Sequence, residues 1–143
     1  MTWLYEDTLF EPEESFLEEY QGFVYQITEL DTGMKYIGKK FFWKPKTLPV
    51  TKTRKRKVKT RTQSDWMKYY GSSQELKEAV ASRGADNYKR EVLKFCRTKG
   101  ECSYYEAKLQ FEYDVLLRDD YYNAFIGCKI HAKHLPQKKW KIT

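Results

Sequence analysis

The chain has 143 residues, a formal net charge of +7 and an aromatic content of 17%. This length is typical of one domain with its own core, and no apolar stretch is long enough to cross a membrane as a helix. Three cysteines (Cys96, Cys102 and Cys128) without Cys-x2-Cys spacing favour reduced thiols and a cytoplasmic location over a secreted disulfide framework.

The N-terminal segment, residues 1–21, is predicted to be an acidic arm. Its first 20 residues hold seven acidic side chains and neither lysine nor arginine. Pro12 followed by Glu13 and Glu14 is typical of a helix start, and this helix should reach about Tyr20. Apolar residues such as Trp3 argue against a free tail, so we expect the arm to pack on the domain.

The segment Gly22–Lys40 predicts a β-hairpin. Phe23–Leu30 is rich in β-branched and aromatic residues, Asp31-Thr32-Gly33 is a strong turn signal, and Met34–Ile37 can return as a second strand. The hairpin carries Tyr25 and Tyr36 with ten residues between them.

The register of this hairpin decides whether the two tyrosines share a face. If Glu29 pairs with Met34, Ile27 faces Tyr36, and Tyr25 lies on the same side of the sheet. If Leu30 pairs with Met34 instead, the tyrosines point to opposite faces unless a bulge at Gly33 resets the register. A shared site requires the first register or the bulge.

A strongly basic segment follows the hairpin. Lys39–Arg61 holds eleven lysines and arginines, and no acidic residue lies between Asp31 and Asp65. With no helical or strand period, residues 41–63 are predicted to be an inserted basic loop. Such a charge block indicates a polyanionic partner, with a solvated loop or a targeting signal as alternatives. The candidate nucleic-acid contacts are Lys44, Lys46, Lys52, Arg54, Lys55, Arg56, Lys57, Lys59, Arg61 and Lys68.

The rest of the chain completes a predicted α/β (α+β) fold, a small three-stranded antiparallel sheet flanked by helices. Ser72 and Glu75 form a potential capping box for a helix that Gly84 ends. Tyr88–Cys96 reads as the third strand. Gly100 is expected to precede a long helix over Ser103–Arg118.

The C-terminal segment, residues 131–143, is predicted to be a basic tail that adds a second cationic patch. Cys128, His131 and His134 have the spacing Cys-x2-His-x2-His. Without a second ligand pair, this spacing is weak evidence for structural zinc.

The triplet Tyr36-Ile37-Gly38, ten residues after Tyr25, resembles the signature of the GIY-YIG nuclease superfamily. The first triplet departs from that signature by one extra residue between Gly22 and Tyr25. The resemblance implies a nuclease domain over residues 22–130, similar to small free-standing phage endonucleases, that cuts DNA with one Mg²⁺ or Mn²⁺ per site.

The resemblance also implies roles for individual residues. The family's metal-binding glutamate lies on a helix after the third strand, where Glu106 stands, although Glu106 could instead cap that helix with Ser103. Tyr25 would be the general base, with its pKa lowered by nearby cations, and Tyr36 would help to position the water. The remaining candidates are Lys39 or Lys40 at the phosphate, Tyr70 or Tyr69 before the first long helix, and Asn123 as support.

Two readings without catalysis remain open. A basic, aromatic nucleic-acid-binding protein would share every feature except the ordered set of Tyr25, Tyr36, Glu106 and Asn123. An interaction protein could pair its acidic arm with the basic segment of another protomer.

The oligomeric state would decide how a nuclease of this kind cuts DNA. A monomer would nick one strand, and a homodimer could cut both.

Overall fold

The computed structural model describes residues 2–53, 55–127, 130 and 132–135. Its centre is a five-stranded sheet in the order β2-β1-β7-β3-β4. The strands are β1 (Trp3–Tyr5), β2 (Thr8–Leu9), β3 (Gly22–Glu29), β4 (Lys35–Phe41) and β7 (Tyr88–Cys96). The prediction of three antiparallel strands is wrong in number, because the N-terminal segment adds β1, parallel to β7, and β2.

The central hairpin adopts the register that places both tyrosines on one face. Glu29 N donates to Met34 O at 2.7 Å, and Ile27 pairs with Tyr36. Tyr25 consequently lies opposite Gly38. Since facing residues share a side and alternate residues return to it, Tyr25, Tyr36 and Gly38 all lie on the same face of the sheet.

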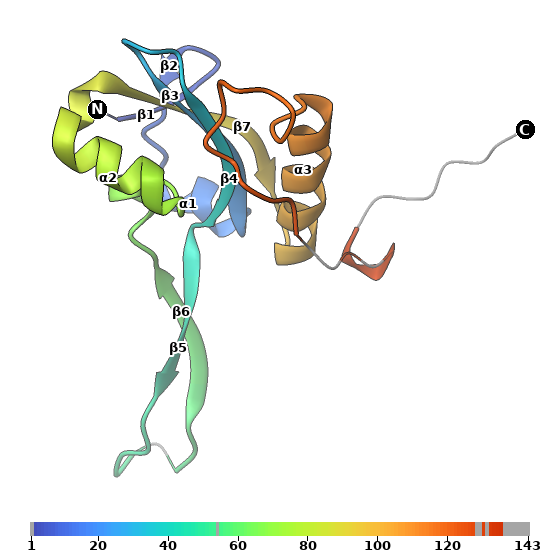
Figure 1. The fold of residues 1–143 in the computed structure, drawn as a ribbon. Helices are drawn as coiled ribbons and strands as arrows, with labels where there is room; N and C mark the ends of the chain where they lie inside the picture. Colours follow the sequence, from blue (N-terminus) through green and yellow to red (C-terminus); the bar gives the residue numbers. More distant parts are fainter. Residues whose placement is uncertain (1, 54, 128–129, 131, 136–143) are drawn as a thin grey trace, which may run out of the picture.

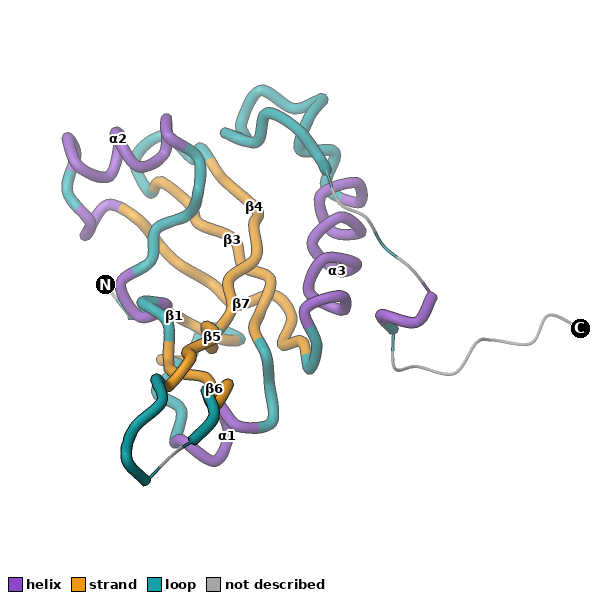
Figure 2. Tube along the Cα trace, turned by 90° about the horizontal axis from the view of Figure 1, so that it is seen from below, coloured by secondary structure: helices purple, strands orange, loops and turns teal. Residues whose placement is uncertain are grey.

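Helices cover the two faces of the sheet (Figures 1 and 2). On the tyrosine face, α2 (Gln74–Arg83) packs its buried Leu76 in a core with Phe23, Ile27 and Tyr88. On the other face, α3 (Lys99–Glu112) packs against Val24 and Ile37 of β3 and β4. Because β4 ends the sheet, its edge is the place where groups from both faces can meet.

The helix boundaries differ from the sequence predictions at both N-termini, and the long helix ends at Glu112 instead of Arg118. The cap of α2 is Ser73, whose hydroxyl accepts from Leu76 N at 3.3 Å, and Gly84 ends the helix at φ +89° as expected. The long helix begins at Lys99, because the Thr98 hydroxyl caps it by accepting from Glu101 N at 3.0 Å. Gly100 therefore lies inside α3.

The basic segment predicted as a loop forms a second, two-stranded sheet. Its strands β5 (Trp43–Leu48) and β6 (Val58–Gln63) pair in the antiparallel sense, from Trp43 opposite Gln63 to Leu48 opposite Val58. Figure 1 shows this pair extending away from the body as a narrow ribbon. The loop prediction failed because both faces of the ribbon are largely exposed, so no alternation of apolar and polar residues marks the strands.

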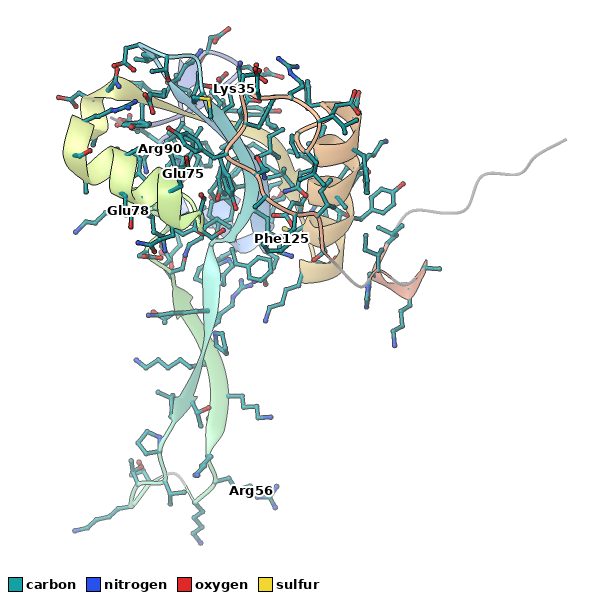
Figure 3. The ribbon with its side chains drawn as sticks, in the orientation of Figure 1. Lys35, Arg56, Glu75, Glu78, Arg90 and Phe125 are labelled. Atoms are coloured by element: carbon teal, nitrogen blue, oxygen red, sulfur yellow. The ribbon has the colours of Figure 1, made fainter. Side chains whose placement is uncertain are left out.

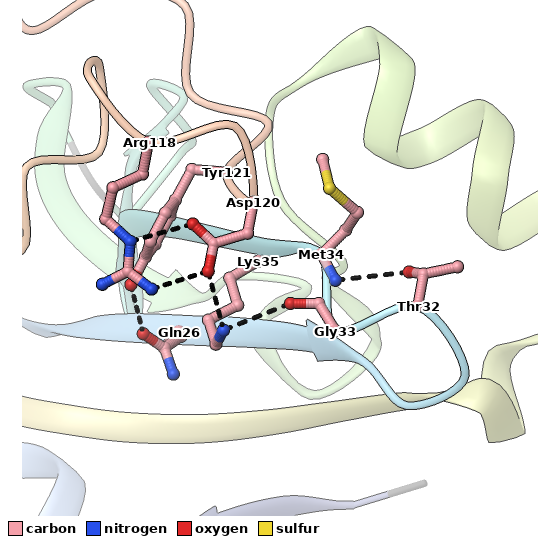
Figure 4. A network of polar contacts seen from close by, with 8 residues as sticks. All are labelled: Gln26, Thr32, Gly33, Met34, Lys35, Arg118, Asp120 and Tyr121. Atoms are coloured by element: carbon pink, nitrogen blue, oxygen red, sulfur yellow. Dashed lines mark hydrogen bonds and ion pairs between the residues drawn. The ribbon is translucent and has the colours of Figure 1, made fainter.

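The segment after α3 returns to the free edge of β4. Lys35 N donates to Asp120 O at 2.8 Å, and Tyr122 N donates to Lys35 O at 2.7 Å. Side chains reinforce this contact: Asp120 binds both Arg118 and Lys35, and the Tyr121 hydroxyl donates to Gln26 (Figure 4). An exposed strand edge is thus partly covered by the chain itself.

The remaining elements are short. They are α1 (Glu14–Glu18) and the 3-10 turns η1 (Trp66–Lys68), η2 (Ala85–Asn87) and η3 (Ala132–His134). Among the residues that the structure describes, no helix has the length and apolar character needed to span a membrane.

Candidate active site

Tyr25 and Tyr36 are packed together over Gly38. Their ring centroids are 6.2 Å apart. A Cβ atom at Gly38 would lie 2.5 Å from the Tyr25 hydroxyl oxygen and 2.8 Å from the Tyr36 ring. The glycine of the second triplet is therefore required by space, because the two tyrosine rings occupy the volume that any larger residue would need.

The two tyrosines differ in their access to solvent. Tyr25 is fully buried, and its hydroxyl makes no hydrogen bond of normal geometry with the described residues. Burial, followed by repulsion from Tyr69 and Tyr36, raises the pKa of Tyr25 well above its ordinary value. The expectation that nearby lysines lower this pKa is wrong.

Tyr36 is half-buried, and its hydroxyl lies 2.7 Å from Ser72 Oγ. Burial raises the pKa of Tyr36 as well, and the hydrogen bond to Ser72 partly offsets this effect. Tyr36 is therefore the tyrosine of the pair whose hydroxyl faces an open cleft.

Glu106 approaches the same strand from the opposite face of the sheet. It lies in the middle of α3, since the helix is capped by Thr98, so the alternative role of Glu106 as a capping residue with Ser103 is excluded. Its side chain is 16% exposed and lies 3.7 Å from Lys39 Nζ. Burial raises the pKa of Glu106, although the charge of Lys39 opposes the shift.

One cleft at the edge of β4 joins these groups. It has a volume of about 480 Å³, and its lining includes Tyr36, Ser72, Glu106, Gln110 and Asn123. Tyr36 of β4, the start of α2, α3 and the segment after α3 thus all line a single hollow.

Asn123 and Gln110 line this cleft and hold β4 beside it. Asn123 Oδ1 accepts from Ile37 N at 3.0 Å, and its Nδ2 donates to Ile37 O at 2.8 Å. Gln110 Nε2 donates to the same carbonyl at 2.9 Å. Asn123 therefore satisfies both the N–H and the C=O of Ile37, the residue between Tyr36 and Gly38. A neighbouring strand would satisfy these groups in the same way.

The two lysines after the second triplet diverge, because successive side chains on a strand point to opposite faces. Lys39 points toward α3, where its ammonium donates to Ser103 Oγ at 2.8 Å. Lys40 lies 2.7 Å from Asp65 and 4.0 Å from the ring centroid of Tyr69. Both lysines, together with Lys44, line a second hollow at the root of the ribbon.

Tyr69 and Tyr70 occupy different places. Tyr69 packs edge-on against Tyr25, with ring centroids 5.9 Å apart. The Arg90 guanidinium lies 4.2 Å from the centroid of the Tyr70 ring, and Tyr70 lines a different hollow. The geometry thus brings Tyr69, rather than Tyr70, to the tyrosine pair.

The candidate nucleic-acid contacts that the structure describes are exposed, and Lys68 lies on η1, away from the others. Arg54 lies outside the described residues, as do Cys128, His131 and most of the 131–143 tail. The ribbon and its tip carry Lys44, Lys46, Lys52, Lys55, Arg56, Lys57, Lys59 and Arg61.

Sequence reasoning missed Ser72 and Gln110 as parts of the cleft. Ser72 was considered only as a helix cap, yet its hydroxyl contacts Tyr36. Gln110 lies one helical turn after Glu106, and this i, i+4 spacing was the signal that could have placed it beside the metal candidate.

The carboxylate of Glu106 suits a divalent cation. It is poorly solvated, and its ion pair with Lys39 is loose at 3.7 Å. Among the described residues no group of three or more His, Cys, Asp or Glu side chains could hold a metal. The arrangement therefore fits one hard cation that keeps water ligands, as Mg²⁺ commonly does.

A comparison with known protein families finds a match over most of the chain. The family model described as "Putative endonuclease segE, GIY-YIG domain" matches residues 3–126. That range includes β1, both tyrosines, Glu106 and Asn123. Comparisons with curated proteins and with solved structures find no match. The chain therefore belongs to the SegE-type GIY-YIG family of the GIY-YIG nuclease superfamily.

Proposed function

We propose that this protein is a metal-dependent DNA endonuclease that hydrolyses phosphodiester bonds in the cleft at the edge of β4. The observation that carries the proposal is the meeting of Tyr36 and Glu106 in one cleft, although they come from opposite faces of the sheet. Family membership supports a nuclease role in general.

Glu106 would hold one Mg²⁺ or Mn²⁺ ion. A bound divalent cation supplies charge stabilisation for the phosphate and the leaving oxygen. Because burial raises the pKa of Glu106, the metal must displace a more tightly held proton, so metal binding should strengthen as the pH rises. Lys39, which lies beside Glu106, would contact a non-bridging phosphate oxygen as a point charge.

Tyr36 would orient the attacking water and accept its proton. A tyrosine hydroxyl can donate and accept hydrogen bonds, but it takes a proton only in its tyrosinate form. Because Tyr25 is fully buried, we assign the proton-accepting role to Tyr36. Tyr25 would support Tyr36 from beneath, and Tyr69 would hold Tyr25 and Lys40 in place.

Asn123 would keep β4 rigid beside the site by binding both backbone groups of Ile37. Exposed basic residues of the ribbon would contact the phosphate backbone and supply most of the affinity. The substrate would be DNA, bound by a monomer that nicks or by a homodimer.

The direct test is the conversion of supercoiled plasmid to open-circle or linear DNA with Mg²⁺ or Mn²⁺. Glu106→Gln should reduce the rate at least 100-fold, because the neutral amide holds a divalent cation poorly. Glu112→Gln is the matched control, since Glu112 is an exposed residue near the end of the same helix.

The wild type and Glu112→Gln should cleave at similar rates. If no protein cleaves but all three bind DNA equally, the site is not catalytic on duplex DNA and the chain is a binding protein. Equal cleavage by Glu106→Gln and wild type would remove Glu106 from the site.

A further inference from the structure

We propose that the β5–β6 ribbon enters the major groove of duplex DNA, with the face that carries Lys44, Lys46, Thr60 and Thr62 turned toward the base edges. This inference rests on the proposed function for its DNA substrate. It adds which form of DNA the chain binds, which groove it occupies and which residues contact the bases.

The shape of the ribbon suits a groove of duplex DNA. It consists of two strands only, and Figure 3 shows that it projects from the body with Arg56 at its far end. Six residues per strand at about 3.3 Å each give a length of roughly 20 Å, or about six base pairs. The major groove of B-DNA is wide enough to admit a two-stranded ribbon, whereas the minor groove is about half as wide.

The charge of the ribbon identifies a polyanion as its partner. Between Asp31 and Asp65 the sequence contains no acidic residue. The ribbon itself presents Lys44, Lys46, Lys59 and Arg61, and its tip adds further lysines together with Arg56. A bare ribbon edge invites aggregation, and lysines with Pro45 protect it against pairing with another protein strand. The same surface remains open to a nucleic acid.

Strand alternation divides the ribbon into two faces. Lys44 lies opposite Thr62 and Lys46 opposite Thr60, so these four side chains share one face. The other face holds Pro45 with Arg61, and Thr47 with Lys59. Two lysines near the same level, Lys46 and Lys59, therefore point in opposite directions.

The position of Lys44 indicates which face meets the DNA. Lys44 lines the hollow at the ribbon's root together with Lys39 and Lys40 of β4, and Trp43 and Pro45 of the opposite face line it as well. The lysine of the Lys44 and Lys46 face nearest the root therefore lies beside the two lysines of β4. On the opposite face, Arg61 is occupied at the root, where its guanidinium lies 4.1 Å from the centroid of the Trp43 ring.

The ribbon is fixed firmly enough to position DNA relative to the cleft. Trp43 Nε1 donates to Leu17 O at 2.9 Å and to Tyr20 O at 3.1 Å. Ser64 N donates to Phe42 O at 2.8 Å on the other side of the root. Since β5 continues directly from β4, a ribbon seated in the groove would set the distance between the bound flank and the scissile phosphate.

The first experiment measures DNA binding in EDTA, without cleavage, on duplexes of one sequence. Replacing thymines by deoxyuridines with a bulky C5 substituent fills the major groove, and should weaken binding by the wild type at least tenfold. A saturating minor-groove ligand should change the affinity less than twofold. Equal binding to both duplexes, or competition by the minor-groove ligand, would overturn the proposal.

The matched pair Lys46→Gln and Lys59→Gln tests the assigned face. Substituting 7-deazaguanine removes the N7 acceptor to which a lysine in the major groove can donate. Wild type and Lys59→Gln should lose the same affinity on this duplex, whereas Lys46→Gln should lose less, because only Lys44 then remains on the face toward the bases. An equal loss for all three proteins would overturn the assignment of Lys46 to the base edges.

Plasmid cleavage with Mg²⁺ separates this inference from the proposed function. If the wild type cleaves but is indifferent to major-groove substituents, only the ribbon's placement is wrong. If it binds through the major groove but never cleaves, the ribbon inference stands and the catalytic proposal fails.

Discussion

At the scale of single residues, the site depends on the missing side chain of Gly38. A Cβ there would approach the Tyr25 hydroxyl to 2.5 Å and the Tyr36 ring to 2.8 Å. Gly38→Ala should therefore destabilise the fold by about 1–3 kcal/mol, because both rings must shift in a packed core. Denaturant unfolding measures this loss.

Gly127→Ala is the control for that substitution, since the nearest heavy atom to a new Cβ there is 3.5 Å away. Unchanged stability of Gly38→Ala would mean that the tyrosine pair is loosely packed.

The hydrogen bond between Ser72 and Tyr36 governs the predicted pH dependence. A general base acts when deprotonated, and burial raises the pKa of Tyr36, so cleavage should increase as the pH rises into the alkaline range. The Ser72 hydroxyl lowers this pKa. Ser72→Ala should therefore shift the pH profile of kcat/KM to higher pH, whereas Ser82→Ala, an exposed change on α2, should not.

A profile for Ser72→Ala that coincides with that of the wild type would contradict the role of Tyr36 as the base. A lower rate at every pH without a shift would assign Ser72 to structure alone.

At the scale of elements, the segment after α3 acts as a partial sixth strand against β4. Asn123→Ala removes two hydrogen bonds to the backbone of Ile37. Losing partners of this kind costs about 1–3 kcal/mol, so amide exchange of Ile37 should accelerate by roughly tenfold or more. Hydrogen exchange followed by NMR measures this change.

Asn87→Ala is the matched control, because Asn87 makes an exposed hydrogen bond to Asp31. If exchange at Ile37 is the same in Asn123→Ala and in the wild type, Asn123 does not hold the strand.

The sequence predicted correctly those elements that bury one face, because their apolar residues recur at the spacing of a strand or a helix. The range of β7 matches the third strand predicted at Tyr88–Cys96, and the register of the hairpin follows the Glu29 alternative. The start of α3 was misplaced because Ser103 also offered a capping pattern, whereas Thr98 provides the cap. Thr98 and Ser103 are both residues that can cap a helix, and the sequence alone does not show which of them does so. The packing of the surrounding chain decides between them.

Elements that do not show a regular spacing of apolar residues along one face could not be predicted in this way. Strand β1 has three residues, too few for an alternation, and its pairing with β7 joins residues far apart in sequence. The ribbon lacks an apolar face. Likewise, the choice between Tyr69 and Tyr70 depends on which ring meets Tyr25, and that is decided by the tertiary fold.

At the scale of the whole molecule, the net charge of +7 and the ribbon predict binding that depends strongly on salt. A protein that neutralises 6–10 phosphates loses about 10³–10⁵-fold in affinity between 50 and 200 mM salt. Affinity measured across that range should fall steeply, and Lys59→Gln should reduce the slope of the log–log plot by about 1. A flat dependence would contradict phosphate contact by the ribbon.

The central claim is that Tyr36 and Glu106 act together across one strand edge. The most direct test is a double-mutant cycle of Tyr36→Phe and Glu106→Gln, measured as the rate of plasmid cleavage with Mg²⁺. Residues of one catalytic unit have non-additive effects, so the double variant should be about as slow as the slower single variant. Losses that multiply would contradict the account, because they would show two residues acting independently.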